Sequence, residues 1–198
     1  NRMTVSHVVY DKEIHVTPLT PIMDGDTFKQ YDPNDEHFQA LQRIATLNCD
    51  EVFLDEEPDV LKRATKGDAS EGALIKFVQP ISDIYDYRLA CPRVFAVPFN
   101  SSNKWMCSIN VQGQTKFLGT PSKNLLLMIK GAPEKIIAMC STIYYKGSVH
   151  KIDEAGKKDL EKTNEVLAKR GERVLGFAHL ELDSSFHEKF PFDQENPN

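Results

Sequence analysis

The stretch LLLMIKGAPE, residues 125–134, decides the fold of this chain. Its first five residues are apolar and have the length of a buried strand. Pro133 suits the first turn of a following helix, where a missing N–H costs nothing. Gly131 lets backbone approach a ligand closely. Lys130 is therefore expected at a strand-to-helix turn beside a positive helix end, which suits a phosphate-bearing ligand such as a nucleotide. A common connector with a solvated lysine is the alternative.

The segments on either side of this stretch carry strand and helix signals in no regular βαβ order. Strands are expected at residues 1–10, 13–16, 93–99, 105–111, 124–130 and 173–182, and a hairpin at 142–152. Helices are expected at residues 34–48, from about 70, at 133–140 and from 153 to 171, with caps at Asp68 and Asp153. This order predicts an α+β fold, a mostly antiparallel twisted sheet flanked by helices, in a single domain of residues 1–198.

The amino-acid composition and net charge disfavour some classes of function. Hydrophobic residues make up 40% and charged residues 27% of the 198, which is typical of a soluble globular domain. The net charge of −5 disfavours nucleic-acid binding, and an anionic ligand would need a local basic cluster. The four cysteines are widely spaced and predict reduced thiols, with no metal site. The acidic run is interpreted as solvated surface: Asp50, Glu51, Asp55, Glu56, Glu57 and Asp59.

The common phosphate-binding motifs are absent from the sequence. It contains neither Gly-x-x-x-x-Gly-Lys-Ser/Thr nor a Gly-x-Gly-x-x-Gly that follows a strand. A nucleotide would therefore have to be held largely through its base.

Five segments carry a family resemblance. They are Asn1–Val5 (NRMTV), Gly67–Glu71 (GDASE), Pro98–Lys104 (PFNSSNK), Lys130–Glu134 (KGAPE) and Gly171–Phe177 (GERVLGF). In this order and spacing they resemble the nucleotide-binding domain of the P-type cation pumps, nearest to the sodium/potassium and proton/potassium branch. The first resembles the segment that follows the phosphorylated Asp-Lys-Thr-Gly-Thr loop, so the resemblance implies an excised domain.

The resemblance implies roles for individual residues, each with a simpler structural alternative. Phe99 would stack on adenine, although a core position is commoner for phenylalanine. Lys130 would lie deep in the pocket beside Gly131, and Glu71 would accept a hydrogen bond from the adenine amino group. Lys104 and Arg173 would approach the nucleotide, with Arg173 pairing a phosphate, or would be surface charges.

Four further positions complete the implied ATP site. Asp68 and Ser70 are equally well explained as helix caps and as pocket polar groups. Met106 stands where the resembled pumps usually have glutamine, and Ala178 where they usually have cysteine. The methionine removes a hydrogen-bonding amide from the expected pocket.

The resemblance implies a domain that binds ATP and presents it to an aspartate of a neighbouring phosphorylation domain. Magnesium, the actuator domain, an accessory β-subunit and a place on the cytoplasmic side of a plasma membrane would belong to the full pump. No catalytic residue is expected within the chain. Two alternatives stay open: a proton/potassium or other cation pump of the same type, and an interaction module that no longer binds nucleotide. A self-contained phosphotransferase is disfavoured, because the sequence has no metal-binding acidic cluster with a catalytic motif.

Overall fold

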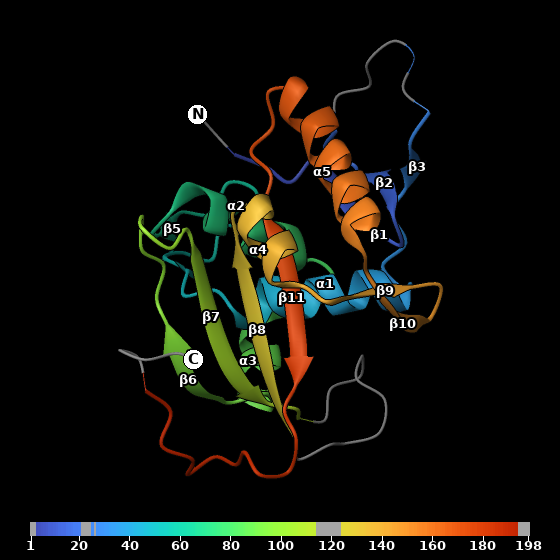
Figure 1. Cartoon of the computed structure of the whole chain (residues 1–198). Coiled ribbons are helices and arrows are strands. Elements are labelled where there is room, and N and C mark those ends of the chain that lie inside the picture. The colour runs from blue at the N-terminus through green and yellow to red at the C-terminus, as the bar shows by residue number, and fades with distance from the viewer. Residues whose placement is uncertain (1–2, 21–24, 26, 114–123, 194–198) are drawn as a thin grey trace.

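A four-stranded antiparallel sheet lies at the centre of the computed structural model, which describes residues 3–20, 25, 27–113 and 124–193. In spatial order its strands are β11 (Gly176–Glu181), β8 (Leu125–Gly131), β7 (Trp105–Val111) and β6 (Arg93–Val97). The stretch that opens the sequence analysis thus forms an inner strand, as its continuous apolar run predicts. Figure 1 shows β8 between β7 and β11, with the start of α4 above its end.

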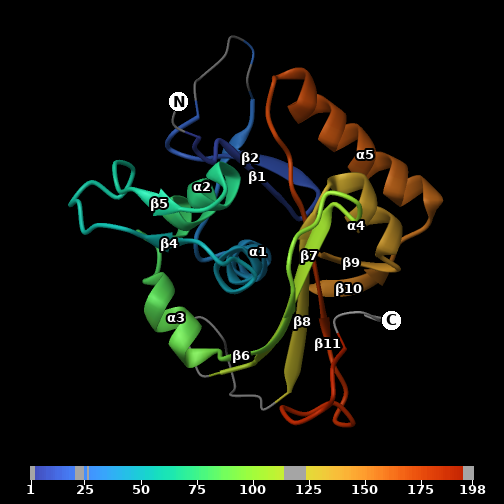
Figure 2. The ribbon, with the colours of Figure 1, turned by 90° about the vertical axis from the view of Figure 1, so that its left-hand side faces the viewer.

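One face of this sheet is covered by α1 (Glu36–Leu47), α2 (Ala69–Val78) and α3 (Ile84–Ala90). Figure 2 shows these three helices on one side of the sheet and the remaining helices on the other. The apolar side chains of α1 and α3 pack on β8, where Leu126 and Met128 are buried. A second cluster joins α1, α2 and α3 through Ala45, Ile75 and Ile84.

The other face carries α4 (Pro133–Met139), α5 (Glu154–Lys169) and the hairpin of β9 (Thr142–Tyr145) and β10 (Ser148–Lys151). Short strands form two small sheets beside the helices. They are β1 (His7–Tyr10), β2 (Glu13–Val16) and β3 (Lys29–Gln30), and the pair β4 (Val52–Phe53) and β5 (Thr65–Lys66).

Aspartates begin four of the five helices in the described ranges of the chain. Asp35, Asp68, Asp83 and Asp153 each accept backbone N–H bonds from the first turn of the helix that follows. A cap of this kind stabilises a helix by about 0.5–2 kcal/mol. The predicted caps Asp68 and Asp153 are confirmed, and so is the α+β fold with its antiparallel sheet.

The structure corrects some element boundaries. The helix α3 was not predicted, and the first strand begins only at His7. Of the segment Asn1–Val5, the first two residues lie outside the described residues. The last strand begins at Gly176, where its ladder with β8 starts, and not at Arg173.

The end of the sheet where β8 begins is apolar. Ile109, Leu125 and Leu182 are buried together there, and Phe186 and Phe192 from the C-terminal segment pack against them. Figure 1 shows this red segment passing below the sheet. We call this region the apolar end and the opposite one, where β8 ends, the Lys130 end. No helix in the described part of the chain has the length and apolarity needed to cross a membrane.

Candidate functional site

Lys130 is the central charge of the Lys130 end, and it is only 3% exposed. Its ammonium lies 2.9 Å from Oε1 of Glu71 and donates a hydrogen bond to the carbonyl of Asn48. An ammonium removed from water without such partners would cost several kcal/mol. The structure therefore excludes the alternative of a solvated strand end for Lys130.

Gly131, the next residue, is required by a close approach of backbone. It pairs with Trp105 of β7 on one side and with Gly176 of β11 on the other. A Cβ at this position would collide with the carbonyl oxygen of Lys104. A side chain here would therefore push the loop that carries Lys104 away from the strand end.

Glu71 reaches Lys130 from the first turn of α2. Asp68, the cap of this helix, accepts the N–H groups of Ser70 at 2.8 Å and Glu71 at 3.3 Å. The other carboxylate oxygen of Glu71 lies 3.3 Å from the sulfur of Cys49. Burial raises the pKa of the Glu71 carboxyl, but a hydrogen bond with Glu51 and the charge of Lys130 outweigh it and hold the pKa below its ordinary value.

Glu51 is a further member of this cluster, which the sequence analysis placed on the solvated surface. That interpretation is wrong for Glu51, which is 6% exposed. Its Oε1 accepts the backbone N–H of Asp68 at 2.5 Å, and its carboxyl is hydrogen-bonded with that of Glu71. Burial and the neighbouring Glu71 raise the pKa of the Glu51 carboxyl to about 7.

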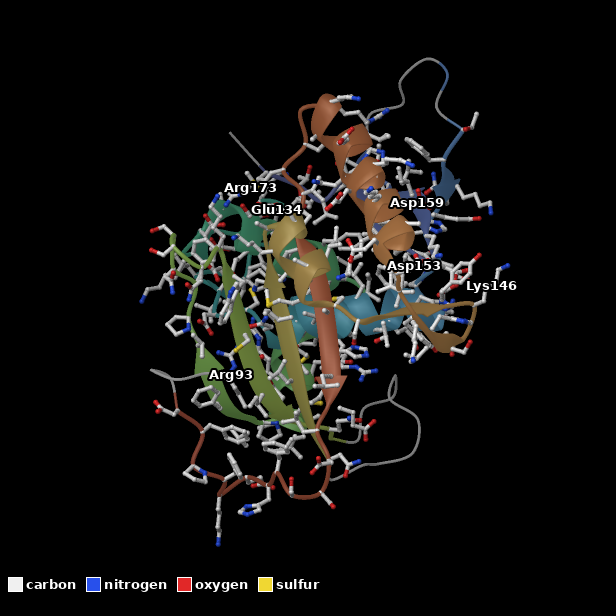
Figure 3. All side chains as sticks on the ribbon, viewed as in Figure 1. Arg93, Glu134, Lys146, Asp153, Asp159 and Arg173 are labelled. Carbon is white, nitrogen blue, oxygen red and sulfur yellow. The ribbon has the colours of Figure 1, made fainter. Side chains whose placement is uncertain are left out.

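Asp68 and Arg173 are near enough for their charges to interact. Burial works against ionisation of Asp68, but the N–H donors of α2 and the positive charge of Arg173 lower its pKa. Figure 3 shows Arg173 at the same end of the molecule as Glu134, where α4 begins, and Arg93 far from both. Ser70 is buried and Arg173 is exposed, so only the arginine is free to meet a charged ligand from solvent.

Phe99 and Lys104 come from the loop between β6 and β7. Phe99 is 54% exposed, which excludes a core position for it. Asn100 closes the loop by accepting the N–H of Asn103 at its side chain, 2.7 Å, and that of Lys104 at its carbonyl, 2.9 Å. The carbonyl of Lys104 accepts the N–H of Ala132, which fixes the loop to the end of β8.

The sheet register decides which neighbours share a face with Lys130. Met106 of β7 and Phe177 of β11 are its direct partners in the ladder, so their side chains point to the same face. Met106 is 3% exposed. Ala178 pairs with Ile129 and therefore points to the opposite face. The structure thus brings the predicted site residues to one end of the sheet, but Ala178 is turned away from Lys130.

Two other features of the structure have some properties of a binding site. In the described part of the chain, Cys49, Glu51 and Glu71 are close enough to hold a metal ion, with ligand atoms within 4.8 Å of one another. Burial raises the pKa of the Cys49 thiol to about 12, and Lys130 already supplies a positive charge to Glu71. These two facts disfavour a metal ion in the cluster.

A hollow of about 300 Å³ lies between α1, α3 and the sheet, and it includes Arg88 and Arg93. Both arginines donate to backbone carbonyls at the end of α1, among them that of Cys49. Arg93 also pairs with Asp50. The two guanidinium groups thus anchor the end of the helix rather than present a free charge.

The comparisons with known proteins agree with this geometry. A family model described as P-type ATPase, cytoplasmic domain N, matches residues 37–198. The chain is 40% identical over 202 residues to the sodium/potassium-transporting ATPase subunit alpha-1 of Anguilla anguilla. It is 38% identical over 203 residues both to the sodium/potassium-transporting ATPase subunit alpha of Tetronarce californica and to the potassium-transporting ATPase alpha chain 1 of Xenopus laevis. Each match covers 100% of this chain and 19% of the relative.

Proposed function

The chain belongs to the P-type ATPases, as their cytoplasmic domain N, and from this membership we propose that it binds ATP at the Lys130 end of the sheet. The chain spans about a fifth of the length of a relative. In the full pump, the bound ATP would be presented to an aspartate of the phosphorylation domain. The relatives point to a sodium/potassium-type pump. The domain as proposed is a single unit of residues 1–198.

The buried ion pair of Lys130 and Glu71 is the observation that carries this proposal. Such a pair contributes little net stability, because the cost of removing both charges from water offsets their attraction. The loop that carries the exposed ring of Phe99 is fixed to the same end of β8, and this combination favours a binding role for the pair over a structural one. The pair offers a carboxylate acceptor and a cation within one small volume.

Each side chain has a defined part in the proposed complex. The ring of Phe99 stacks on adenine, a contact of about 1–3 kcal/mol that needs no particular base edge. Glu71 accepts the adenine amino group, which favours adenine over guanine. Lys104 and Arg173 contact the phosphates, where a guanidinium can make paired hydrogen bonds. Lys130 holds Glu71 and approaches the nucleotide.

The remaining predicted residues support these contacts. Asp68 and Ser70 position the first turn of α2, and Gly131 keeps the Lys104 loop close to the strand. Met106 packs beside Lys130. The proposal does not assign a contact to the side chain of Ala178.

The chemistry proposed for this chain is positioning. With ATP held in this way, closure of the domains would bring the γ-phosphate to the acceptor aspartate. This orientation would lower the barrier to phosphoryl transfer. Mg²⁺ would enter with the phosphates in the full enzyme. The phosphorylation and actuator domains, an accessory β-subunit and a plasma-membrane location are proposed for the full protein only. The chain alone should bind ATP without magnesium and without hydrolysing it.

Calorimetric titration tests the proposal. ATP should bind with a dissociation constant of roughly 0.1–1 mM, because the chain has one stacked base and a few solvated charge contacts. Lys130→Met should weaken binding about tenfold or more, while the matched control Lys169→Met, at a lysine 78% exposed on α5, should not change it. GTP should bind more weakly than ATP. If ATP binds neither Lys130→Met nor Lys169→Met, or binds both variants equally well, the proposal fails.

A second candidate concerns the transported ion. The identity to the potassium-transporting ATPase of Xenopus laevis, 38%, equals that to one of the sodium/potassium-transporting relatives. A proton/potassium pump or another cation pump therefore stays a candidate for the full protein. A domain that has lost ATP and serves only as an interaction module would give no heat with ATP in the same titration.

A further inference from the structure

Glu51 occupies a place that the backbone has made for it. It follows α1 and immediately precedes β4, and its Oε1 accepts the N–H of Asp68. Gly67 has φ +116°, and a Cβ on this residue would coincide with the carboxyl group of Glu51. A side chain at position 67 would therefore expel Glu51 from the cluster.

The carboxyl of Glu51 faces a closely packed set of charges. Glu71 lies against it on α2, Lys130 beyond Glu71 on β8, and the thiol of Cys49 lies 3.8 Å from its Oε2. Asp68 presents its N–H, and Arg88 of α3 donates to the main-chain carbonyl of Glu51 at 2.8 Å. The nearest ionised carboxylate is thus Glu71, and the nearest ammonium, Lys130, is paired with that same Glu71.

Two carboxyls in such contact share one negative charge, because a proton between them removes their repulsion. The pKa of Glu51 is raised to about 7 by burial and by Glu71, whereas the pKa of Glu71 is lowered. The proton of the pair therefore resides on Glu51. In this state Glu51 donates to Glu71, and Glu71 keeps the full charge that Lys130 neutralises.

We propose that Glu51 is a positioning residue of the ATP site: its protonated carboxyl holds the Glu71 carboxylate and Lys130 in place for adenine, so that nucleotide binding is coupled to uptake of a proton. This inference rests on the proposed function. When Glu51 loses its proton, a second negative charge faces Glu71 and competes for Lys130. The carboxylates then separate, and the pocket becomes more negative toward an anionic ligand.

The test compares Glu51→Gln with the wild-type chain. A glutamine keeps the volume, can donate to Glu71 and can accept from Asp68, but does not titrate. Dissociation constants are measured by NMR titration at pH 6 and pH 8, with ATP and with adenosine as ligands. Adenosine has no group that titrates in this range. For ATP, whose phosphate does titrate, the pH dependence of binding to Glu51→Gln measures the part that comes from the ligand. Glu165→Gln, at a glutamate 65% exposed on α5, is the matched charge control.

From pH 6 to pH 8, the wild type and Glu165→Gln should both lose affinity for ATP and for adenosine. This loss should be about three- to tenfold larger than the loss in Glu51→Gln. Calorimetry near pH 7.5 in two buffers of different ionisation heat should show more proton uptake on ATP binding by the wild type than by the variant. Glu51→Ala should bind more weakly than the wild type at pH 6, and Gln at this position should restore that affinity.

The outcomes separate the two claims. If Glu51→Gln and the wild type bind ATP with the same pH profile and the same proton uptake, Glu51 has only a structural role and this inference is wrong, while the proposed function stands. If none of the proteins binds ATP, the proposed function fails and this inference fails with it.

Discussion

The two ends of the central sheet are built on opposite principles, although the same strands run through both. At the apolar end, β8 begins with Leu125, which is 1% exposed and packs with Ile109 and Leu182. At the Lys130 end, the same strand finishes with a buried ammonium that the Glu71 carboxylate and a backbone carbonyl hold in place, with the carboxyl of Glu51 against that of Glu71. The first arrangement gains free energy from burial. In the second, the cost of removing the charges from water offsets most of the free energy that their attraction contributes.

The difference indicates which end serves stability and which serves binding. A domain can hold buried charge at one end of a sheet only where the rest of its core compensates for it. Substitutions at the apolar end should therefore act on folding, and substitutions at the Lys130 end should act on ATP affinity.

Leu125→Ala should have the largest effect. Removing a fully buried leucine leaves a cavity and should lower the free energy of unfolding by about 2–5 kcal/mol. Urea denaturation followed by circular dichroism measures this loss. The protein that stays folded should bind ATP as before. A loss of ATP affinity without a loss of stability would contradict the assignment of this end.

Phe99→Ala should show the reverse pattern. Its ring is 54% exposed, so the midpoint of thermal unfolding should hardly change. ATP binding should weaken by about 1–3 kcal/mol, the value of one stacked base. Calorimetry on the variant checks the affinity. Phe95→Ala is the matched control, because Phe95 packs at the apolar end and should affect stability instead.

The pH dependence of stability should report the carboxyl pair. Unfolded, both carboxyls titrate near 4.5, whereas folded Glu51 keeps its proton up to a pKa of about 7. The contribution of Glu51 to the free energy of unfolding is therefore complete below pH 4.5 and is lost as the pH rises through 7. Glu71, with a lowered pKa, acts in the opposite sense, and its contribution is lost only as the pH falls below about 4.5.

From pH 4.5 to pH 7, the wild type should consequently lose about 1–2 kcal/mol of unfolding free energy relative to Glu51→Gln. Urea titrations of both proteins across this range measure the difference. Parallel curves would mean that Glu51 titrates normally in the folded chain.

Met106→Gln should have the smallest effect. Met106 is buried beside Lys130, and a thioether is a weak hydrogen-bond acceptor. A glutamine there should tighten ATP binding by about 0.5–1.5 kcal/mol, the net value of one hydrogen bond. Unchanged or weaker binding in titrations at equal salt would identify Met106 as an adapted apolar contact.

Much of the fold could be predicted from local signals. The apolar run before Lys130 predicted β8, the alternation from Trp105 predicted β7, and Asp68 and Asp153 marked helix starts. The helix α3 was missed because it has seven residues and too few turns to show a period, although Asp83 was a usable cap signal.

The site was less accessible to such reasoning. The motifs identified Lys130, Glu71 and Phe99, but not Glu51, which sequence reasoning assigned to the solvent with its acidic neighbours. Glu51 is buried where Gly67, with its positive φ, leaves room for its carboxyl and the start of α2 donates an N–H to it. That contact joins residues far apart in the chain, and neither hydrophobic periodicity nor propensity reports it. The turn of Ala178 to the opposite face likewise depends on strand register.

Chemical-shift mapping of an ATP titration observes both ends of the sheet in one experiment, and so shows directly at which end ATP binds. If ATP binds at the Lys130 end, the backbone amides of Glu71, Phe99, Lys104 and Lys130 should show saturable shifts, and the amides around Leu125 and Ile109 should be unaffected. Shifts concentrated at the apolar end, or none at millimolar ATP, would contradict binding at the Lys130 end.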